Sequence, residues 1–312
     1  MSKPSRIQYR DLHGIVLLDK PIGLSSNQAL QGVRRLLRAA KGGHAGALDP
    51  LASGLLPLCF GEATKLAGTL LGASKGYLAE CRLGISTDTG DREGEVTARQ
   101  PVPRLDPGLI EAALAPLRGA IRQVPPMYSA LKQDGERLYV KARRGESVER
   151  PARDVVVHRL ELLSRDGDTL QLLVECGSGT YVRSLATDLG ATLGCGAHLT
   201  ALRRTWVDPF RNPHMVTMAE LEQAAEQGDE ALLRHLLPVA EGLCDLPSVH
   251  LGEAQAMAIS RGQPIQLDPS VPVGRCAAFA PDGALLAVLE LDDLRRSRIL
   301  RGFNLPPAGG FA

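Results

Sequence analysis

The pattern of apolar and polar positions predicts a mixture of strands and helices in the first part of the chain. An unbroken apolar run over 14–18 is typical of a short buried strand, and period-two alternation over 77–85 is typical of a half-buried one. Apolar residues at helical spacing predict a helix between the candidate caps Ser25, Ser26 and Asn27 and the Gly42-Gly43 pair. The Gly- and Pro-rich stretch 43–50 is expected to be a loop without regular structure.

The rest of the chain shows the same mixture. The segments 155–163 and 169–176 flank an Arg-Asp-Gly-Asp turn signal and predict a β-hairpin. Residues 122–153 are Pro-rich and then heavily charged, and we expect a long surface excursion there. Because strands and helices follow no regular βαβ rhythm, the pattern favours the α+β class over a doubly wound sheet. Further helices are expected over 62–71, 106–117, 180–193 and 219–253.

The charged residues are balanced over the whole chain but segregated along it. The 36 Lys and Arg against 35 Asp and Glu leave a net charge of +1, which argues against holding nucleic acid by bulk charge. Residues 1–41 (eight basic, two acidic) carry +6 and residues 122–159 (nine basic, five acidic) carry +4, whereas residues 219–253 (one basic, eight acidic) carry −7. The two basic stretches are either solvated faces or a surface that suits a folded RNA loop.

Composition and cysteine usage indicate an ordinary cytoplasmic protein. The chain is 44% hydrophobic and 23% charged, and its 312 residues allow about two domains. Residues 1–10 show no signal-peptide pattern, and the longest uncharged run, 50–61, is too short for a membrane helix. The six cysteines are dispersed and are expected to be reduced thiols. Cys195 and His198 form a lone C-x-x-H without further ligands, so no metal site is predicted.

Several common signatures of enzymes are missing from the sequence. It has no G-x-x-x-x-G-K-[ST] phosphate loop, no G-x-S-x-G elbow, no H-E-x-x-H helix and no DxDxDG loop. The Gly177-Ser178-Gly179 segment begins like a dinucleotide fingerprint but lacks the last glycine. We therefore expect a mechanism without a cofactor.

Asp49 is the most distinctive candidate for chemistry. It lies between Leu48 and Pro50, where it is either a turn residue before proline or a nucleophilic or general-base carboxylate on a rigid loop. An apolar setting of leucines would raise its pKa, so an ionised Asp49 needs a cationic partner. Arg183, on the helix predicted over 180–193, is one candidate for that partner.

Several further motifs follow one another in a fixed order. They are LDKP (18–21), GHAGALDPLASG (43–54), GEATK (61–65), Tyr77, PMYSALK (126–132), GTYVRSL (179–185) and LRRT (202–205). Together, over about residues 12–210, they resemble the TruB family of bacterial tRNA pseudouridine-55 synthases. The resemblance implies a pseudouridine-synthase fold with a mixed, largely antiparallel central sheet flanked by helices.

The resemblance also implies an activity and a set of catalytic roles. The protein would be an isomerase that converts the T-loop uridine at position 55 of tRNA to pseudouridine by base flipping, with the tRNA T-stem-loop as its partner and as a monomer. Asp49 would be the nucleophile, and Arg183 would keep it ionised and oriented. Tyr77 would stack on the uracil and later take the proton from C5. The order of the chemical steps stays open.

Substrate contacts follow from the same resemblance. Tyr181 and Leu202 would line the uracil pocket, and His44 would fill the gap that the flipped uridine leaves in the RNA. Lys20 and Pro21 would support the active-site loop. The candidates for contact with RNA are Lys20, Lys132, Arg143 and Arg144.

The domain organisation implied by the resemblance has two parts. Residues 1–245 would be the catalytic domain, with an RNA-binding insertion at about 122–153, and residues 246–312 a PUA-like β-barrel with a tail. Two positions depart from the family pattern, since Ala45 replaces a common Thr and Gly76 replaces a residue that is often basic.

Two other functions remain open on the residues alone. The first is an RNA-binding or tRNA-folding module in which Asp49 is inert. The second is a nucleoside or glycoside hydrolase, which would need a second carboxylate as general acid, such as Glu62 or Asp88.

Overall fold

The computed structural model describes residues 8–129, 131–133, 135–146 and 148–306. A large mixed sheet of nine strands, counted within these residues, is its central feature. The strands are β1 (Gly14–Lys20), β2 (Gly42–His44), β3 (Ala52–Phe60), β4 (Lys75–Leu83), β7 (Gly119–Gln123), β10 (Arg153–Asp166), β11 (Thr169–Cys176), β12 (Ala197–Val207) and β13 (Val216–Thr217).

The order of the strands explains how distant motifs meet. It is β13-β1-β3-β12-β4-β11-β10-β7, with β2 paired to β3. The pairs β1–β13 and β3–β12 are parallel, and the other neighbours are antiparallel. The expected α+β class with a mixed, largely antiparallel sheet is therefore confirmed. The centre of the sheet joins β3, β12 and β4, which come from three separate parts of the chain.

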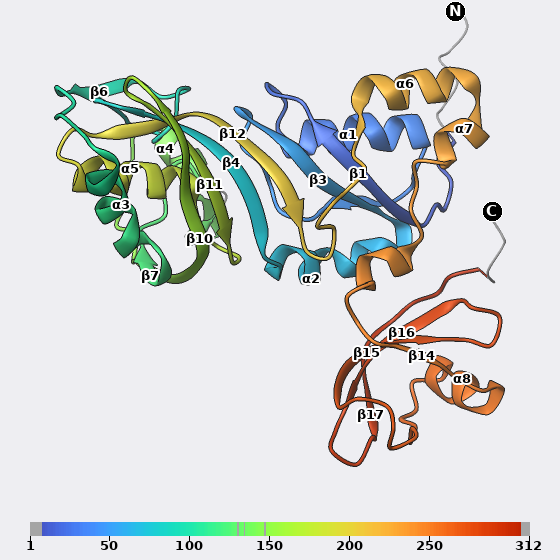
Figure 1. Ribbon diagram of the computed structural model, residues 1–312. Helices are drawn as coiled ribbons and strands as arrows, with labels where there is room; N and C mark the ends of the chain where they lie inside the picture. Colours follow the sequence, from blue (N-terminus) through green and yellow to red (C-terminus); the bar gives the residue numbers. More distant parts are fainter. Residues whose placement is uncertain (1–7, 130, 134, 147, 307–312) are drawn as a thin grey trace, which may run out of the picture.

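Helices cover the two ends of the sheet (Figure 1). At the end formed by β1 and β3 lie α1 (Ser26–Leu37), α6 (Met218–Gln227) and α7 (Asp229–Leu233), and near β10 lie α3 (Pro107–Leu114) and α5 (Val182–Thr192). Among the helices of the described residues, none is both long and apolar enough to cross a membrane. The shorter elements are the helices η1 (Gly61–Leu66), α2 (Ala67–Gly72), η2 (Ala115–Leu117), α4 (Leu138–Arg143) and η3 (Val239–Leu243), and the strands β5 (Ile85–Thr87), β6 (Val96–Arg99), β8 (Lys132–Gln133) and β9 (Glu136–Arg137).

Alternation along the strands builds a core on each face of the sheet. On β1, Val16 and Leu18 join one cluster with apolar residues of α1 and α5, whereas Ile15 and Leu17 join a second cluster on the opposite face. The first cluster also holds Tyr77 and Leu202, so the candidate pocket residues lie on the face that α1 and α5 cover.

Most of the elements expected from the pattern are present, with three corrections. The first helix ends at Leu37, before the glycine pair, because Arg38 takes a left-handed φ of 51° and its N–H closes the last turn. The stretch expected to be a loop begins with β2, which pairs with the end of β3. The helical expectation over 219–253 is wrong beyond α7, because Pro238 and Pro247 interrupt it.

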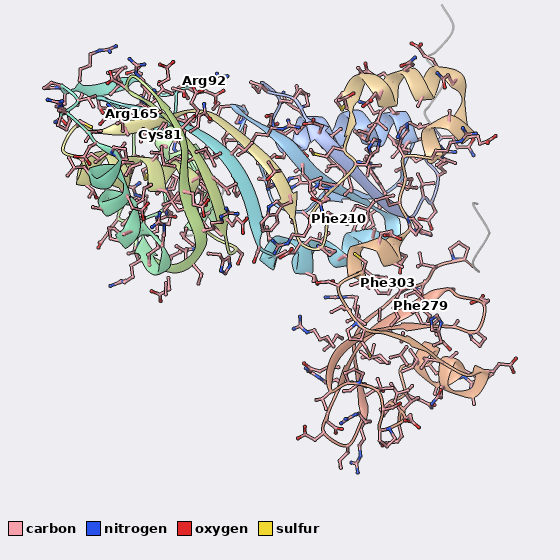
Figure 2. The ribbon with its side chains drawn as sticks, viewed as in Figure 1. Cys81, Arg92, Arg165, Phe210, Phe279 and Phe303 are labelled. Atoms are coloured by element: carbon pink, nitrogen blue, oxygen red, sulfur yellow. The ribbon has the colours of Figure 1, made fainter. Side chains whose placement is uncertain are left out.

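A smaller C-terminal unit packs against the part of the chain that forms the nine-stranded sheet. Its four strands, counted in the described residues, are β14 (Ser248–His250), β15 (Gly274–Phe279), β16 (Leu285–Leu291) and β17 (Ser297–Gly302), and its helix is α8 (Glu253–Ser260). It has an apolar cluster of its own. Phe210 and Phe303 belong to one cluster at the junction, where Figure 2 labels both. Across the same junction, the Asn304 N–H donates to Glu62 Oε2 at 2.6 Å.

Candidate active site

The loop that carries Asp49 is held in one shape by hydrogen bonds from several elements. Buried Ser26, at the start of α1, accepts the Leu48 N–H at 2.7 Å and donates to the Leu48 carbonyl at 3.0 Å. The Pro50 carbonyl accepts the Gly23 N–H at 2.8 Å. Asp49 itself accepts the Ala52 N–H on its carbonyl at 3.0 Å, at the start of β3. Its side chain therefore projects from a backbone that is fixed on both sides.

The structure brings Arg183 to Asp49. Arg183 is the second residue of α5, and its Nε lies 2.9 Å from Asp49 Oδ2. The two terminal nitrogens donate to the carbonyls of Thr89 and Tyr128, at 2.9 and 2.8 Å. Because Arg183 is only 3% exposed, these carbonyls and not water hold its guanidinium. The cation is thus aimed at Asp49 by the protein itself.

A second carboxylate, that of Asp91, approaches the same nitrogen of the Arg183 guanidinium. Its Oδ2 is 3.6 Å from the Arg183 Nε, and its Oδ1 accepts from Thr89 Oγ1 at 2.7 Å and from the Glu93 N–H at 3.0 Å. The next residue, Arg92, is labelled in Figure 2 and donates its N–H to the Leu199 carbonyl of β12. Asp91 was not identified from the sequence, where it is one acidic residue of a polar turn.

Burial and the neighbouring charges shift the pKa of the Asp49 carboxyl in opposite directions. Desolvation raises the pKa of its carboxyl, and Arg183 opposes that rise as the strongest of the cationic neighbours. Because 41% of the side chain is still accessible, we expect a smaller rise than for a fully enclosed carboxyl. Asp91 adds to the rise, whereas Lys20 reduces it. Without Arg183, the carboxyl would hold its proton at a higher pH.

Tyr77 and Leu202 lie on neighbouring strands of the same face. Leu202 on β12 pairs with Ala79 on β4, two residues from Tyr77, and both side chains are 8% exposed. Burial raises the pKa of the Tyr77 phenol, and the nearby Arg204 cation opposes that rise. The two side chains therefore offer an apolar wall with one hydroxyl.

Arg204 is a buried cation that the sequence analysis did not select. It is 1% exposed, and it donates from Nε to the Leu55 carbonyl at 2.7 Å and from a terminal nitrogen to the Gly46 carbonyl at 3.0 Å. It is the cross-strand partner of Tyr77. Arg204 thus connects the Tyr77 strand to the backbone of the Asp49 loop. Arg204 belongs to the LRRT motif, but the sequence alone does not distinguish it from the adjacent Arg203.

The remaining pocket candidates lie at the ends of elements. Tyr181 is the residue from which α5 starts, and burial raises the pKa of its phenol. His44 is the last residue of β2 and lies opposite Leu58 of β3. Each is half-buried.

The candidates for contact with RNA differ in their placement. Lys20 is fully buried, and its Nζ donates to the carbonyls of Pro21 and Leu24 at 2.9 and 2.6 Å. Burial lowers its pKa to about 8. With its ammonium held by two backbone carbonyls, Lys20 is suited to support of the loop. Arg144 is exposed and pairs with Glu136 and Glu146, whereas the side chains of Lys132 and Arg143 lie outside the described part of the chain.

The structure explains one of the two departures from the family pattern. A Cβ on Gly76 would overlap the indole nitrogen of Trp206 on β12, so a larger residue at 76 requires the indole to move. Ala45 is fully buried in the cluster behind the loop. For the residues described, we also find no group of three or more His, Cys, Asp and Glu side chains placed to hold a metal ion.

Comparisons with known proteins show the family of the chain. The TruB family pseudouridylate synthase N-terminal domain matches residues 34–182, and the tRNA pseudouridylate synthase B C-terminal domain matches residues 183–243. A tRNA pseudouridine synthase B of Xanthomonas campestris is 54% identical over 97% of this chain and 99% of its own. That of Xylella fastidiosa is 57% identical over 96% and 99%.

A solved structure shows the same fold at low identity. The chain matched in the crystal structure of a Cbf5-Nop10-Gar1 complex has a TM-score of 0.72 and 24% identity, over 95% of this chain and 85% of that one. Fold and relatives together define an RNA-modifying isomerase of the pseudouridine synthase class. Within that class, the chain belongs to the TruB family and has tRNA pseudouridine synthase activity.

Proposed function

We propose that the chain isomerises the T-loop uridine at position 55 of tRNA to pseudouridine, with Asp49 as nucleophile and without a cofactor. The observation that carries the proposal is the 2.9 Å contact between Arg183 Nε and Asp49 Oδ2, made by a guanidinium whose other nitrogens are anchored on backbone carbonyls. Such a cation keeps a partly desolvated carboxylate ionised and pointed in one direction.

The substrate must leave its stack before it can meet Asp49. A uridine in a folded T-loop is stacked, and its extrusion costs a few kcal/mol. His44, a flat side chain next to the Asp49 loop, would recover part of that cost by filling the gap in the RNA. The half-exposed edge of Asp49 is then available to the flipped nucleotide.

The uracil must be retained after the bond between C1′ and N1 breaks. Tyr77, Leu202 and Tyr181 provide largely apolar walls in which the ring can turn and present C5. Tyr77 would then take the proton from C5. Burial raises the pKa of the Tyr77 phenol and so disfavours the phenolate, and the Arg204 cation reduces that rise.

RNA binding outside the pocket would involve two further regions. We assign the insertion at about 122–153, including Arg143 and Arg144, and the PUA-like C-terminal part, residues 246–312, to contacts with the T-stem-loop. Residues 1–245 would act as the catalytic domain, as a monomer in the cytoplasm. The four-stranded sheet and the exposed Arg298 and Arg301 of the C-terminal unit support a surface that follows phosphates.

The hydrolase alternative finds little support in the placement of its acids. Glu62 lies at the junction with the C-terminal unit, where burial raises its pKa but hydrogen bonds from Lys65 and the Asn304 N–H outweigh that effect and lower it. Asp88 is exposed and accepts the Glu95 N–H at 2.8 Å. A general acid needs a raised pKa, and Glu62 has the opposite shift.

The test is to incubate the protein with unmodified elongator tRNA and to map pseudouridine. We expect modification at position 55 by the parent protein and none by Asp49→Asn, while the affinity for tRNA changes by less than about tenfold, or ~1.4 kcal/mol. Asp88→Asn is the matched control, because it removes an exposed carboxylate in a neighbouring loop, and it should retain activity. Product formation by Asp49→Asn would exclude Asp49 as the nucleophile.

A further inference from the structure

We propose that Gln123 is a positioning residue for the reaction, which holds the start of α5 so that Arg183 and Tyr181 keep their places beside Asp49. This inference rests on the proposed function, since it assigns Gln123 a role in that reaction. Gln123 is the last residue of β7 and lies at the point where the chain leaves the sheet for the charged insertion.

Both polar atoms of the Gln123 side chain form hydrogen bonds with the backbone of one residue, Tyr181. Its Oε1 accepts the Tyr181 N–H at 2.8 Å, and its Nε2 donates to the Tyr181 carbonyl at 3.1 Å. Gln123 is 2% exposed, so water cannot replace these bonds without rearrangement of the site. A buried amide whose donor and acceptor both bind a single backbone residue fixes the position and the orientation of that residue.

Tyr181 needs this support because of its place in the helix. It is the N-cap of α5, the position at which Ser, Thr, Asp or Asn normally satisfies the free N–H groups of the first turn. Tyrosine cannot do so, and within the described residues its side chain makes no capping hydrogen bond. Gln123 therefore anchors from a neighbouring strand a helix start that lacks a cap of its own.

The same two segments are joined at two further points. Ser184 Oγ donates to the Val124 carbonyl at 3.0 Å, and Arg183 donates to the Tyr128 carbonyl at 2.8 Å. Of these contacts between residues 123–128 and the start of α5, those of Gln123 are the ones attached to the sheet. Gln123 itself pairs with Arg153 of β10. The β-sheet thus sets the position of Tyr181, and through it the position of Arg183, two residues further along α5.

The chemistry of the side chain makes the role specific. Leucine at 123 would remove the acceptor of the Tyr181 N–H and one of the two donors to the Tyr181 carbonyl, which would keep only the Leu185 N–H at 3.2 Å. Glutamate would keep an acceptor for the N–H, and in its protonated form, which burial favours, it would also donate to the Tyr181 carbonyl. We therefore expect Gln123→Leu to be more defective than Gln123→Glu. A residue that only contributed to stability would show no such order at temperatures well below unfolding.

The experiment compares the parent protein with Gln123→Leu and Gln123→Glu in single-turnover modification of tRNA. At saturating tRNA we expect the rate constant to fall about tenfold to hundredfold for Gln123→Leu, the scale of a small misplacement of reacting groups. The dissociation constant for tRNA should change by less than about threefold, since no phosphate contact is removed. Gln171→Leu is the matched control, because Gln171 donates to Glu80 Oε2 at 2.8 Å on the sheet but does not touch α5 in the described structure.

A second measurement needs no activity. The Asp49 carboxyl can be titrated by carbon NMR in the free protein, where Arg183, Asp91, Lys20 and Glu93 are its charged neighbours. In Gln123→Leu we expect the Asp49 titration to move to higher pH, because Arg183 is no longer aligned, and in Gln171→Leu we expect no change. The titration tests the positioning role of Gln123 separately from the proposed function. If the parent protein formed no pseudouridine, the proposed function would be contradicted, and the titration could still show whether Gln123 positions Arg183.

The outcomes divide as follows. A lower rate constant with an upward-shifted Asp49 titration supports the positioning role. A rate constant within about twofold of the parent's, or a loss confined to tRNA affinity, overturns it. If Gln123→Leu does not fold, then Gln123→Met decides, because methionine has the length of glutamine without its amide, and a parent-like rate constant and titration in that variant would also overturn the proposal.

Discussion

Two arginine–carboxylate clusters in this protein differ strongly in the burial of their arginine. Arg183 is 3% exposed and meets Asp49 and Asp91 with backbone carbonyls on its remaining nitrogens. Arg144, beside α4, has a side chain that is 48% exposed, and it pairs at 2.6 Å with both Glu136 and Glu146. The chemical groups are the same, but the surroundings differ.

The difference shows what each cluster is suited to do. Around Arg183 water is largely excluded, so charge interactions are strong and the geometry cannot change without loss of several hydrogen bonds at once. Around Arg144 water and salt compete with every contact, so its glutamates can be exchanged for other anions such as RNA phosphates. We infer that the buried cluster serves the reaction and the exposed one serves encounter with the RNA.

Among substitutions in the two clusters, Arg183→Gln is expected to lower the reaction rate the most. Loss of the cation leaves Asp49 in a partly desolvated site with Asp91 nearby, so its pKa rises further. Because Asp49 must be ionised to act, activity is lost as pH falls through that pKa, and the acid limb moves to higher pH. Because Asp49 would then be less ionised and less well oriented, we expect a loss of about 10² or more in rate at neutral pH.

The pH profile decides whether Arg183 acts by charge. Arg183→Lys keeps a cation but loses the planar fork that meets the two carbonyls, and its acid limb should lie between those of the parent and Arg183→Gln. The measurement is the single-turnover rate from acid to neutral pH. An acid limb at the same pH in all three proteins would show that Arg183 does not control the ionisation of Asp49.

A smaller but still large effect is expected from Tyr77→Phe. The phenol lies in the apolar cluster at 8% exposure, so Tyr77→Ala would open a cavity at a cost of about 3–5 kcal/mol in stability. A loss of activity in that variant could then result from unfolding as well as from the missing hydroxyl. Phenylalanine keeps the ring and removes only the hydroxyl. If the hydroxyl takes the proton from C5, the rate should fall by about 10²–10⁴ while the melting temperature stays close to the parent's. A parent-like rate with Tyr77→Phe would assign the proton transfer to another group.

Alternation and capping made much of the fold predictable from the sequence. The strand that carries Tyr77 has a clear period of two, and Asp106 followed by Pro107 marks the start of α3 as expected. The strands β3 and β12 were not predicted. β3 is buried on both faces and contains Pro57 and Gly54, so it shows neither alternation nor an ordinary strand composition. A Cβ on Gly54 would overlap the Arg204 carbonyl oxygen of β12, a constraint visible only once the two strands are paired.

The site was predictable as a set of residues but not as a geometry. The motifs named Asp49, Tyr77 and Arg183 through resemblance, and the pairing of Asp49 with Arg183 was one candidate among those that the residues allowed. Asp91 and Arg204 were missed because their roles depend on tertiary contacts, with the Arg183 guanidinium and with the Gly46 carbonyl. Lys20, in contrast, was selected from the sequence as a candidate for contact with RNA, and its side chain is fully buried.

The smallest effect, and the one that tests the exposed side of the comparison, is expected from Arg144→Ala. Because Arg144 must exchange its glutamate partners for a phosphate, its loss should weaken tRNA binding by only about two- to fivefold and make the salt dependence shallower by less than one unit of slope. Arg234→Ala is the matched control, since Arg234 forms an exposed pair with Glu230 in the acidic helical region and should leave both quantities unchanged. Binding is measured over a series of salt concentrations. A salt slope identical to the parent's in Arg144→Ala would remove this arginine from the RNA interface, whereas a fall in the single-turnover rate at saturating tRNA would show that the exposed cluster also reaches the chemistry.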